Sequence, residues 1–348
     1  MNISVIIVNY RTPDHVREVL PLISDHPKVK EIVVVDNHFV EPFVTDIQGV
    51  DVITSESNIG FGGAINLAIK TLSTHWVLLL NPDVRPGPNC VSELINAAQL
   101  TGSPLLGPRF HWDHQRQFRL PPSTGGSVWF ESAMNFASKN RLEKMLVSQY
   151  WNMHHDWFWS MQEPFYQSYV SGACMLVDVS RLALASGDLM DPGLFLYFED
   201  TDLCARAINA GFHPVCVPQA EAVHYWNQSP EPDTPKAQLF SSSSEVYFHK
   251  HFGSFKRANI SGAPLQIDCN DLGKLSDPPL LDLDLLPGAG YCELALSKLF
   301  VPFAQAKITD GAFQINPALW RYMAKGDYFL RTRSRTMGDD QVWKFRKI

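Results

Sequence analysis

Four short apolar runs, separated by helical patterns or turn residues, constrain the fold of this chain more than any other feature of its sequence. The runs are rich in β-branched residues and span 3–8, 31–35, 50–54 and 76–80. Segments 13–23 and 64–72 have the apolar spacing of helices. This alternation predicts βα units and a mostly parallel central sheet, hence an α/β fold.

Polar residues follow these runs at the places where such a sheet binds ligands. Asn9 and Asp36 close the first two runs, and Asp83 comes shortly after the fourth. Ligands of open parallel sheets bind beyond the carboxyl ends of the strands. One polar residue at a strand end is usually a turn former. Three at one sheet edge favour a binding site.

A glycine cluster at 60, 62 and 63 precedes the helical pattern of 64–72. Its spacing does not match G-x-G-x-x-G, and no Walker lysine follows it. Two interpretations stay open. The glycines form a flexible entry to a helix, or they let amides at a helix N-terminus approach a diphosphate or sugar.

Three carboxylates, Glu199, Asp200 and Asp202, directly follow the apolar and aromatic run 195–198 and open a short helical pattern. Acids in a first helical turn complement the helix macrodipole. That interpretation does not explain why the acids adjoin a run that should be buried. Desolvation at such a place raises the pKa of a carboxyl toward working pH, which suits a general base. We therefore predict the catalytic centre here.

Two further features have both a structural and a functional interpretation. His224 follows a predicted strand at 214–217. It is either a histidine satisfied within the core or, as neutral imidazole, a partner of Asp83 in a metal site. Residues 109–165 are rich in Trp and Arg, which fits either helical packing or a wall over the site.

Charge and cysteine usage limit the partners and the compartment. The net charge of −7 argues against a broad nucleic-acid surface. The six cysteines have no CxxC or metal-like spacing and indicate buried thiols in a reducing compartment. Residues 3–8 do not form a signal peptide, and no run approaches the roughly 18–20 apolar residues of a membrane span. We expect a cytoplasmic protein. Peripheral contact at the inner face of the cell membrane and the oligomeric state stay open.

The last part of the chain has a different pattern. Turn residues are frequent across 261–280, which predicts a boundary. Short strands with alternating patterns are expected after it, at 280–284, 290–296, 312–315 and 327–333. This spacing predicts a small all-β sandwich.

With these positions in place, the first 255 or so residues resemble the inverting family 2 nucleotide-sugar glycosyltransferases, and within them the rhamnosyltransferase branch. The resemblance implies a GT-A fold, a nucleotide-diphospho-sugar donor, a divalent cation and direct displacement at the anomeric carbon. The segments that carry it are VIIVNY (5–10), VVVDN (33–37), NIGFGGAIN (58–66), LNPDV (80–84), SGACM (171–175), FLYFEDTDLCAR (195–206) and His224.

The resemblance also implies a donor site. Asn9 and Tyr10 would line the nucleoside pocket, and Asp36 would hydrogen-bond the pyrimidine base. Asn58 and Asn66 would lie near the ribose and diphosphate. Gly62 and Asn81 belong to the same set of donor-binding residues.

The reacting groups follow from the same resemblance. Asp83 matches the second acid of the family's metal-binding DxD element, whose first position here is Asn81, so Asp83 has fewer carboxylate partners. His224 matches a distal metal ligand, and oxygen and imidazole ligands suit Mn²⁺ or Mg²⁺. Asp200 matches the catalytic base, supported by Glu199 and Asp202.

The tail resembles a fibronectin type III-like module, of a kind that spaces or docks rather than catalyses. The expected division is a GT-A catalytic domain over 1–258, a linker over 259–278 and the β domain over 279–348.

The sequence thus leads to one expected function and two alternatives. We expect transfer of a sugar, rhamnose from dTDP-rhamnose, to a glycan or lipid-linked acceptor in cell-surface polysaccharide synthesis. One alternative is the same mechanism with a UDP- or GDP-hexose donor. The other is a catalytically silent nucleotide- or sugar-binding protein.

Overall fold

The predicted N-terminal strands form the centre of a sheet. The computed structural model describes residues 1–38, 42–122, 124–253, 265–282, 289–308, 312–334 and 341–348. Four strands pair in parallel in the order β3-β2-β1-β4, confirming the predicted runs. Their bounds are β1 (Ile3–Asn9), β2 (Val29–Asn37), β3 (Val50–Ser55) and β4 (Trp76–Leu80).

The sheet as a whole is mixed, which corrects the expectation of a mostly parallel one. β9 (Cys174–Asp178) runs antiparallel to both of its neighbours, β4 and β6 (Leu105–His111). β10 (Val215–His224) is parallel to β6 but antiparallel to β5 (Val84–Pro86) and β8 (Phe165–Tyr166). Only a parallel pair needs a crossover connection. The chain reaches β9 after a helical hairpin that packs elsewhere, so β9 can enter in the opposite direction.

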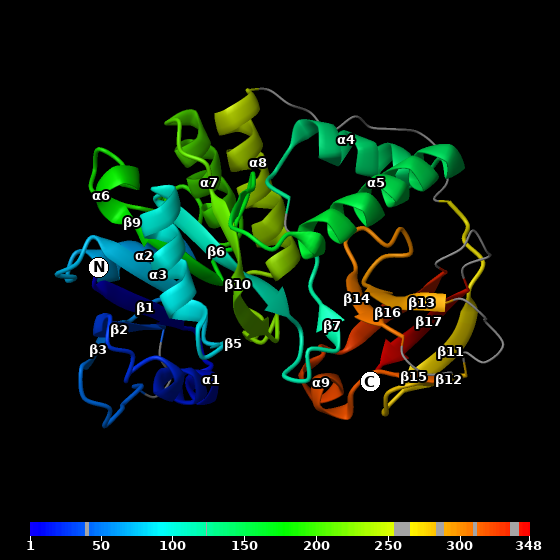
Figure 1. The fold of residues 1–348 in the computed structure, drawn as a ribbon, viewed down its shortest axis with the longest axis horizontal. Helices are drawn as coiled ribbons and strands as arrows, with labels where there is room; N and C mark the ends of the chain where they lie inside the picture. Colours follow the sequence, from blue (N-terminus) through cyan, green and yellow to red (C-terminus); the bar gives the residue numbers. More distant parts are fainter. Residues whose placement is uncertain (39–41, 123, 254–264, 283–288, 309–311, 335–340) are drawn as a thin grey trace.

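Helices cover both faces of this sheet because its strands are apolar on both sides. Ile7 of β1 packs with α1 (Pro13–Val19), η1 (Leu20–Leu22) and α3 (Cys90–Thr101). Its neighbour Ile6 points to the other face. There it packs with α2 (Gly60–Ile69), α6 (Val179–Leu182) and α7 (Glu199–Asn209). The result is a three-layer α/β arrangement, visible on the left of Figure 1.

Two helices, α4 (Val128–Ala137) and α5 (Arg141–Ser160), form a hairpin beside this core (Figure 1). Side chains of Ser127 and Asn140 cap their N-termini. Trp151 of α5 is buried against Phe300 and Phe303 near the C-terminal strands. The aromatic character of 109–165 therefore reflects helical packing in part.

The C-terminal strands continue the sheet. β14 (Ala304–Lys307) pairs with β7 (Phe118–Arg119), and β7 pairs with β6. β12 and β15 form a separate pair. The bounds are β11 (Asn270–Leu275), β12 (Leu280–Asp282), β13 (Ala289–Ala295), β14 (Ala304–Lys307), β15 (Ala312–Gln314), α9 (Pro317–Tyr322), β16 (Gly326–Ser334) and β17 (Val342–Lys347).

The predicted boundary at 258/259 lies outside the described residues, as do 283–284 of the predicted strand 280–284. β11 lies within 261–280, where we expected only turns. The division into 1–258, 259–278 and 279–348 stays a prediction, and so does the fibronectin type III-like sandwich.

The six cysteines are free thiols. Five are buried as expected, and Cys269 is partly exposed. Across the described ranges, we find no helix with both the length and the apolarity needed to span a bilayer.

Candidate active site

A cavity of about 600 Å³ lies beyond the carboxyl ends of β1 and β4 and reaches the first turn of α7. Residues far apart in the sequence meet in its lining, as the strand-end argument predicts. The predicted site residues that line it are Tyr10, Asn58, Asn81, Asp83, Glu199, Asp200 and His224. The others, Asn9, Asp36, Gly62 and Asn66, are not among the lining residues.

Asp200 projects into this cavity from the first turn of α7 and is half-buried. One carboxylate oxygen accepts hydrogen bonds from the Tyr169 hydroxyl and from the Gly172 amide, the latter at 2.9 Å. A Cβ at position 172 would lie 3.1 Å from the Asp200 Cβ, so glycine permits this close approach. Sequence reasoning missed Tyr169. The signal available was its position two residues before the SGACM segment.

Glu199, the neighbouring acid, has a different environment. Its side chain is buried, and its Oε1 has no hydrogen-bond partner among the described residues. Burial, and then the charge of Asp200, raise the pKa of Glu199 to about 8. Glu199 is therefore largely protonated at pH 7. The raised pKa that the sequence predicts for this acidic segment falls on Glu199.

The backbone just before α7 is strained. Tyr197 and Phe198 both have positive φ, 71° and 68°, a conformation that costs non-glycine residues about 1–3 kcal/mol each. The Phe198 ring packs against Phe240 and Tyr247 of α8 (Lys236–Phe252). This strained turn points the first turn of α7 at the cavity.

Asp202, which does not line the cavity, anchors α7 through three side chains. One of its oxygens accepts from Lys250 Nζ at 2.6 Å and from His251 Nε2 at 2.8 Å, both on α8. The other accepts from Arg206 Nε at 2.8 Å. Burial would raise the pKa of Asp202, but the hydrogen bonds from Lys250, Arg206 and His251 hold it below its usual value.

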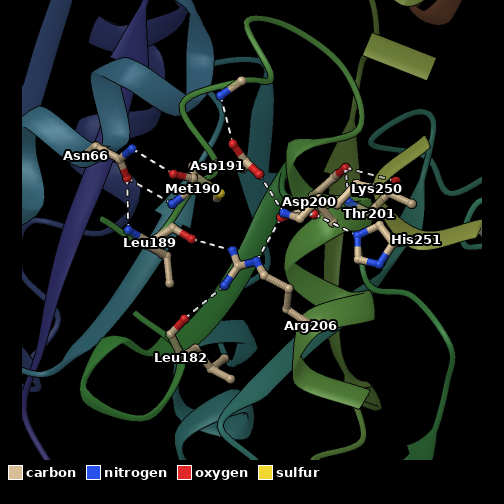
Figure 2. Close-up of polar contacts among 12 residues, drawn as sticks. Asn66, Leu182, Leu189, Met190, Asp191, Asp200, Thr201, Arg206, Lys250 and His251 are labelled. Carbon is tan, nitrogen blue, oxygen red and sulfur yellow. Dashed lines mark hydrogen bonds and ion pairs between the residues drawn. The ribbon is translucent and has the colours of Figure 1, made fainter. Parts of the chain in front are cut away.

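The anchor extends to the loop between α6 and α7 (Figure 2). Arg206 donates to the carbonyl oxygens of Leu182 and Leu189, at 3.0 and 2.5 Å. Asn66 of α2 donates to the Met190 carbonyl at 2.9 Å and accepts from the Leu189 and Met190 amides at 3.0 and 2.9 Å. The Asn66 amide group, predicted to lie near the ribose and diphosphate, thus holds this loop against α2.

Asp83, His224 and Asn81 supply donors that suit a divalent cation. Pairing of β5 with β10 sets His224 opposite Val84, and its Nε2 lies 3.5 Å from Asp83 Oδ2. Burial works to raise the pKa of Asp83, but the charge and hydrogen bond of His224 hold it below its usual value. Asn81 Oδ1 is buried and has no hydrogen-bond partner in the described ranges.

These three side chains fit a cation that also takes ligands from a substrate. Within the described residues, no group of three or more His, Cys, Asp and Glu side chains could hold a metal ion. Mg²⁺ commonly binds through one or two carboxylates together with substrate phosphates and waters. An incomplete protein ligand set is therefore compatible with a metal–diphosphate complex.

Asn9 and Asp36 join the ends of β1 and β2. Asn9 Nδ2 donates to Asp36 Oδ1 at 2.8 Å, and the Phe43 amide donates to Asp36 Oδ2 at 2.8 Å. Both side chains are buried. Tyr10, the next residue, lines the cavity and stacks on His38 with ring centroids 6.4 Å apart.

The glycine cluster lies inside α2, which begins at Gly60 rather than near residue 64 as expected. Gly60 has a φ of 78°, and a Cβ there would meet the Phe195 carbonyl oxygen at 2.2 Å. A Cβ at Gly62 would lie 3.0 Å from the Met190 Cβ. The Phe61 amide donates to the Phe195 carbonyl at 3.0 Å. These glycines let α2 approach the segment that leads into α7.

Comparison with known proteins agrees with this geometry. Residues 4–161 match the family model Glycosyl transferase family 2. The N-acetylglucosaminyl-diphospho-decaprenol L-rhamnosyltransferase of Mycobacterium tuberculosis is 28% identical over 216 residues, which are 57% of this chain and 66% of that enzyme. The chain thus spans just under two thirds of that relative's length. The uncharacterized protein y4gI of Sinorhizobium fredii is 27% identical over 71% of this chain and 27% of its own length.

Among solved structures, GalNAc-T7 with UDP, GalNAc and Mn²⁺ matches 71% of this chain and 48% of its own, with a TM-score of 0.50 and 14% identity. At that identity the likeness concerns the fold alone. The chain has a GT-A-like α/β fold with a large mixed sheet. The family match covers just under half of this chain, and the similarity to family 2 glycosyltransferases is therefore a likeness over residues 4–161.

Proposed function

We propose that this protein is an inverting, metal-dependent glycosyltransferase that moves rhamnose from dTDP-rhamnose to a lipid-linked or glycan acceptor in cell-surface polysaccharide synthesis. The observation that carries the proposal is the meeting of two kinds of group in one cavity. The acids of α7 lie on one side, and Asp83, His224 and Asn81 lie on the other. The rhamnosyl donor rests on the activity in the name of the mycobacterial relative.

Asp200 is the base in this proposal. It accepts the proton of the acceptor hydroxyl as that oxygen attacks the anomeric carbon. The new carbon–oxygen bond forms while the bond from the anomeric carbon to the diphosphate oxygen breaks, and the nucleoside diphosphate leaves. The Tyr169 hydroxyl and the Gly172 amide hold the carboxylate in place through hydrogen bonds to one of its oxygens. Glu199, largely protonated at pH 7, can donate a hydrogen bond to a sugar oxygen.

Asp83, His224 and Asn81 would hold the divalent cation. Once bound, the cation supplies positive charge beside the departing diphosphate. Asp83 would bind the cation as a carboxylate and His224 as a neutral imidazole.

The proposal is tested by thermal stabilisation with dTDP, dTDP-rhamnose, UDP, UDP-hexoses and GDP-hexoses, each with and without Mn²⁺. A ligand that binds the native state raises the melting temperature, and it contributes about 2.7 kcal/mol at a hundredfold excess over its dissociation constant. We expect the largest shift with dTDP-rhamnose and Mn²⁺. Asp83→Asn should remove the metal-dependent part of the shift, and Asp200→Asn should preserve it.

The panel also separates the alternatives. A shift confined to UDP or GDP compounds retains the mechanism and replaces the donor. No shift with any nucleotide contradicts the proposal and favours a catalytically silent protein.

A further inference from the structure

The hairpin of α4 and α5 has an outer face that is strongly apolar and exposed. Trp129 is 63% exposed and Met153 is 72% exposed. The rings of Trp129 and Tyr150 lie 5.6 Å apart in an edge-on arrangement, which joins the two helices on this face. We call this surface the hairpin face; its exposed residues are Trp129, Phe136, Leu142, Met145, Leu146, Tyr150, Met153 and Trp157.

On α5 the exposed apolar side chains form a stripe. Leu142, Leu146, Met153 and Trp157 recur at helical spacing on one side of the helix. The opposite side of α5 is also apolar and packs into the protein through residues such as Trp151. A helix that is apolar on both sides normally has both sides buried. The exposed outer side of α5 therefore indicates an interaction surface.

Positive charge gathers where the two helices meet. Lys139, Arg141 and Lys144 lie within six residues of each other, with Glu143 the one acid of that stretch. The chain as a whole carries a net charge of −7. Of the acids on α5, Asp156 forms an ion pair with Arg333 at 2.7 Å. Lys144 lies on the side of α5 opposite the stripe, so Lys139 and Arg141 are the cations next to the hairpin face, where they complement an anionic surface.

We propose that the hairpin face docks on the surface of an anionic lipid bilayer. Trp and Tyr favour the boundary between headgroups and acyl chains because each has an apolar ring and a polar edge. Met and Leu side chains enter the acyl region, and the cations at the turn meet the headgroups. An exposed apolar helical face with cations beside it fits this plane better than it fits a second copy of an acidic chain.

Docking of the hairpin face on a bilayer would bring the cavity of the candidate active site close to the membrane. Phe130 and Trp151 of the same hairpin line that cavity, and Trp129 stands next to Phe130. An acceptor held in the bilayer by a lipid would therefore reach the cavity along the hairpin. This part of the inference rests on the proposed function.

The test is sedimentation of the full chain with vesicles of phosphatidylcholine alone and of phosphatidylcholine mixed with phosphatidylglycerol. We expect binding to the anionic vesicles that weakens as salt increases. The double variant Leu146→Glu/Met153→Glu should weaken that binding roughly tenfold or more, because both side chains leave water on docking. Leu100→Glu is the matched control: Leu100 is 76% exposed on α3, and the change should leave binding unaltered.

Two results would overturn the inference. One is a wild-type chain that binds neither kind of vesicle. The other is a double variant that binds them as the wild type does. A concentration-dependent dimer, lost in the double variant and present without vesicle binding, would assign the face to a second copy instead.

Nucleotide binding separates this inference from the proposed function. The double variant should keep the wild-type thermal shift with dTDP-rhamnose and Mn²⁺. Vesicle binding without any nucleotide shift would sustain the docking face and refute the glycosyltransferase proposal.

Discussion

On the side of α7 that faces α8, the Asp202 carboxylate accepts hydrogen bonds from Lys250, His251 and Arg206. On the side that faces the cavity, Glu199 is equally buried and has an oxygen without a partner among the described residues. A buried charge is stable only when it is paired, and an unpaired acid becomes neutral instead. One helical turn thus contains an acid that is held ionised to anchor the helix and an acid that is held protonated at the site.

The same contrast recurs between the site and the tail. Glu293 of β13 is fully buried, and Arg331 and Arg333 of β16 pair with it. Arg331 also donates to the Ser148 hydroxyl of α5 at 3.2 Å. This buried glutamate ties secondary structure together, as Asp202 does. Asp202 and Glu293, which pair with arginines, thus hold elements together, whereas Glu199, which lines the cavity, has an oxygen without a partner among the described residues.

The largest effect is expected from a change at the cavity, where Asp200 lies. Asp200→Asn removes the proposed base, so turnover should fall about 10²–10⁴-fold, the range for loss of general base catalysis. The variant should still bind donor, as measured by thermal shift. Wild-type turnover in Asp200→Asn would show that another group takes the proton.

The next effect should come from the anchor. Asp202→Asn removes the fully buried carboxylate that Arg206, Lys250 and His251 share, and breaking a buried ion pair costs at most about 3–5 kcal/mol. Lys250 is exposed and keeps its pair with Asp191. Urea unfolding measures this loss. Asp14→Asn is the control, because Asp14 forms an exposed pair with Arg17 and should contribute at most about 1 kcal/mol. Equal, small losses in both variants would refute the anchor.

Protonation of Glu199 should make the stability of the protein depend on pH. Its pKa is about 8 in the folded protein and near its usual value of 4.5 in the unfolded chain. Between these values the folded state binds more protons than the unfolded state, so this group's contribution to stability falls as pH rises. Between these two pKa values, the free energy of unfolding of the wild type should fall by roughly 1.4 kcal/mol per pH unit relative to that of Glu199→Gln.

The measurement is the difference between the unfolding free energies of wild type and Glu199→Gln at pH 5.5, 6.5 and 7.5. A difference that does not change with pH would mean that Glu199 is ionised in the folded protein. The distinction between the two buried acids of α7 would then disappear.

The smallest effect concerns the glycines that bring α2 to this turn. In Gly60→Ala the positive φ alone should cost about 1–2 kcal/mol, and the clash of the Cβ with the Phe195 carbonyl adds to that cost. Gly63→Ala meets only ordinary contacts in the same helix and should gain about 0.5–1 kcal/mol. Thermal unfolding compares the two. A similar response at both positions would mean that the close approach at Gly60 is not needed.

Much of the fold could be predicted from the sequence, because β-branched runs and helical spacing are local signals. The edge on which Tyr10, Asn81 and Asp83 gather follows from the parallel strands. The antiparallel entry of β9 could not be predicted, since periodicity carries no direction. The two-residue strand β7 is too short to leave a pattern.

The site was predictable in its residue types and less so in its electrostatics. The acidic segment could be identified, but only the folded structure shows which acid faces Lys250 and which faces no cation. Asn66 illustrates a further limit. A resemblance places it near the donor, which stays a prediction, and gives no sign that its amide holds the loop at Leu189 and Met190. Such partners come from segments that no local pattern connects.

The pairing of β7 with β14 has a consequence for how the chain is made. Trp112 and Phe118, near β7, share their cluster with Leu294 of β13 and Phe345 of β17. A ribosome releases β7 long before it releases these later strands. Until then the two aromatic side chains and one edge of β7 remain uncovered, in a form prone to aggregation. Trp112 and Phe118 therefore become covered only after β13, β14 and β17 have been synthesised.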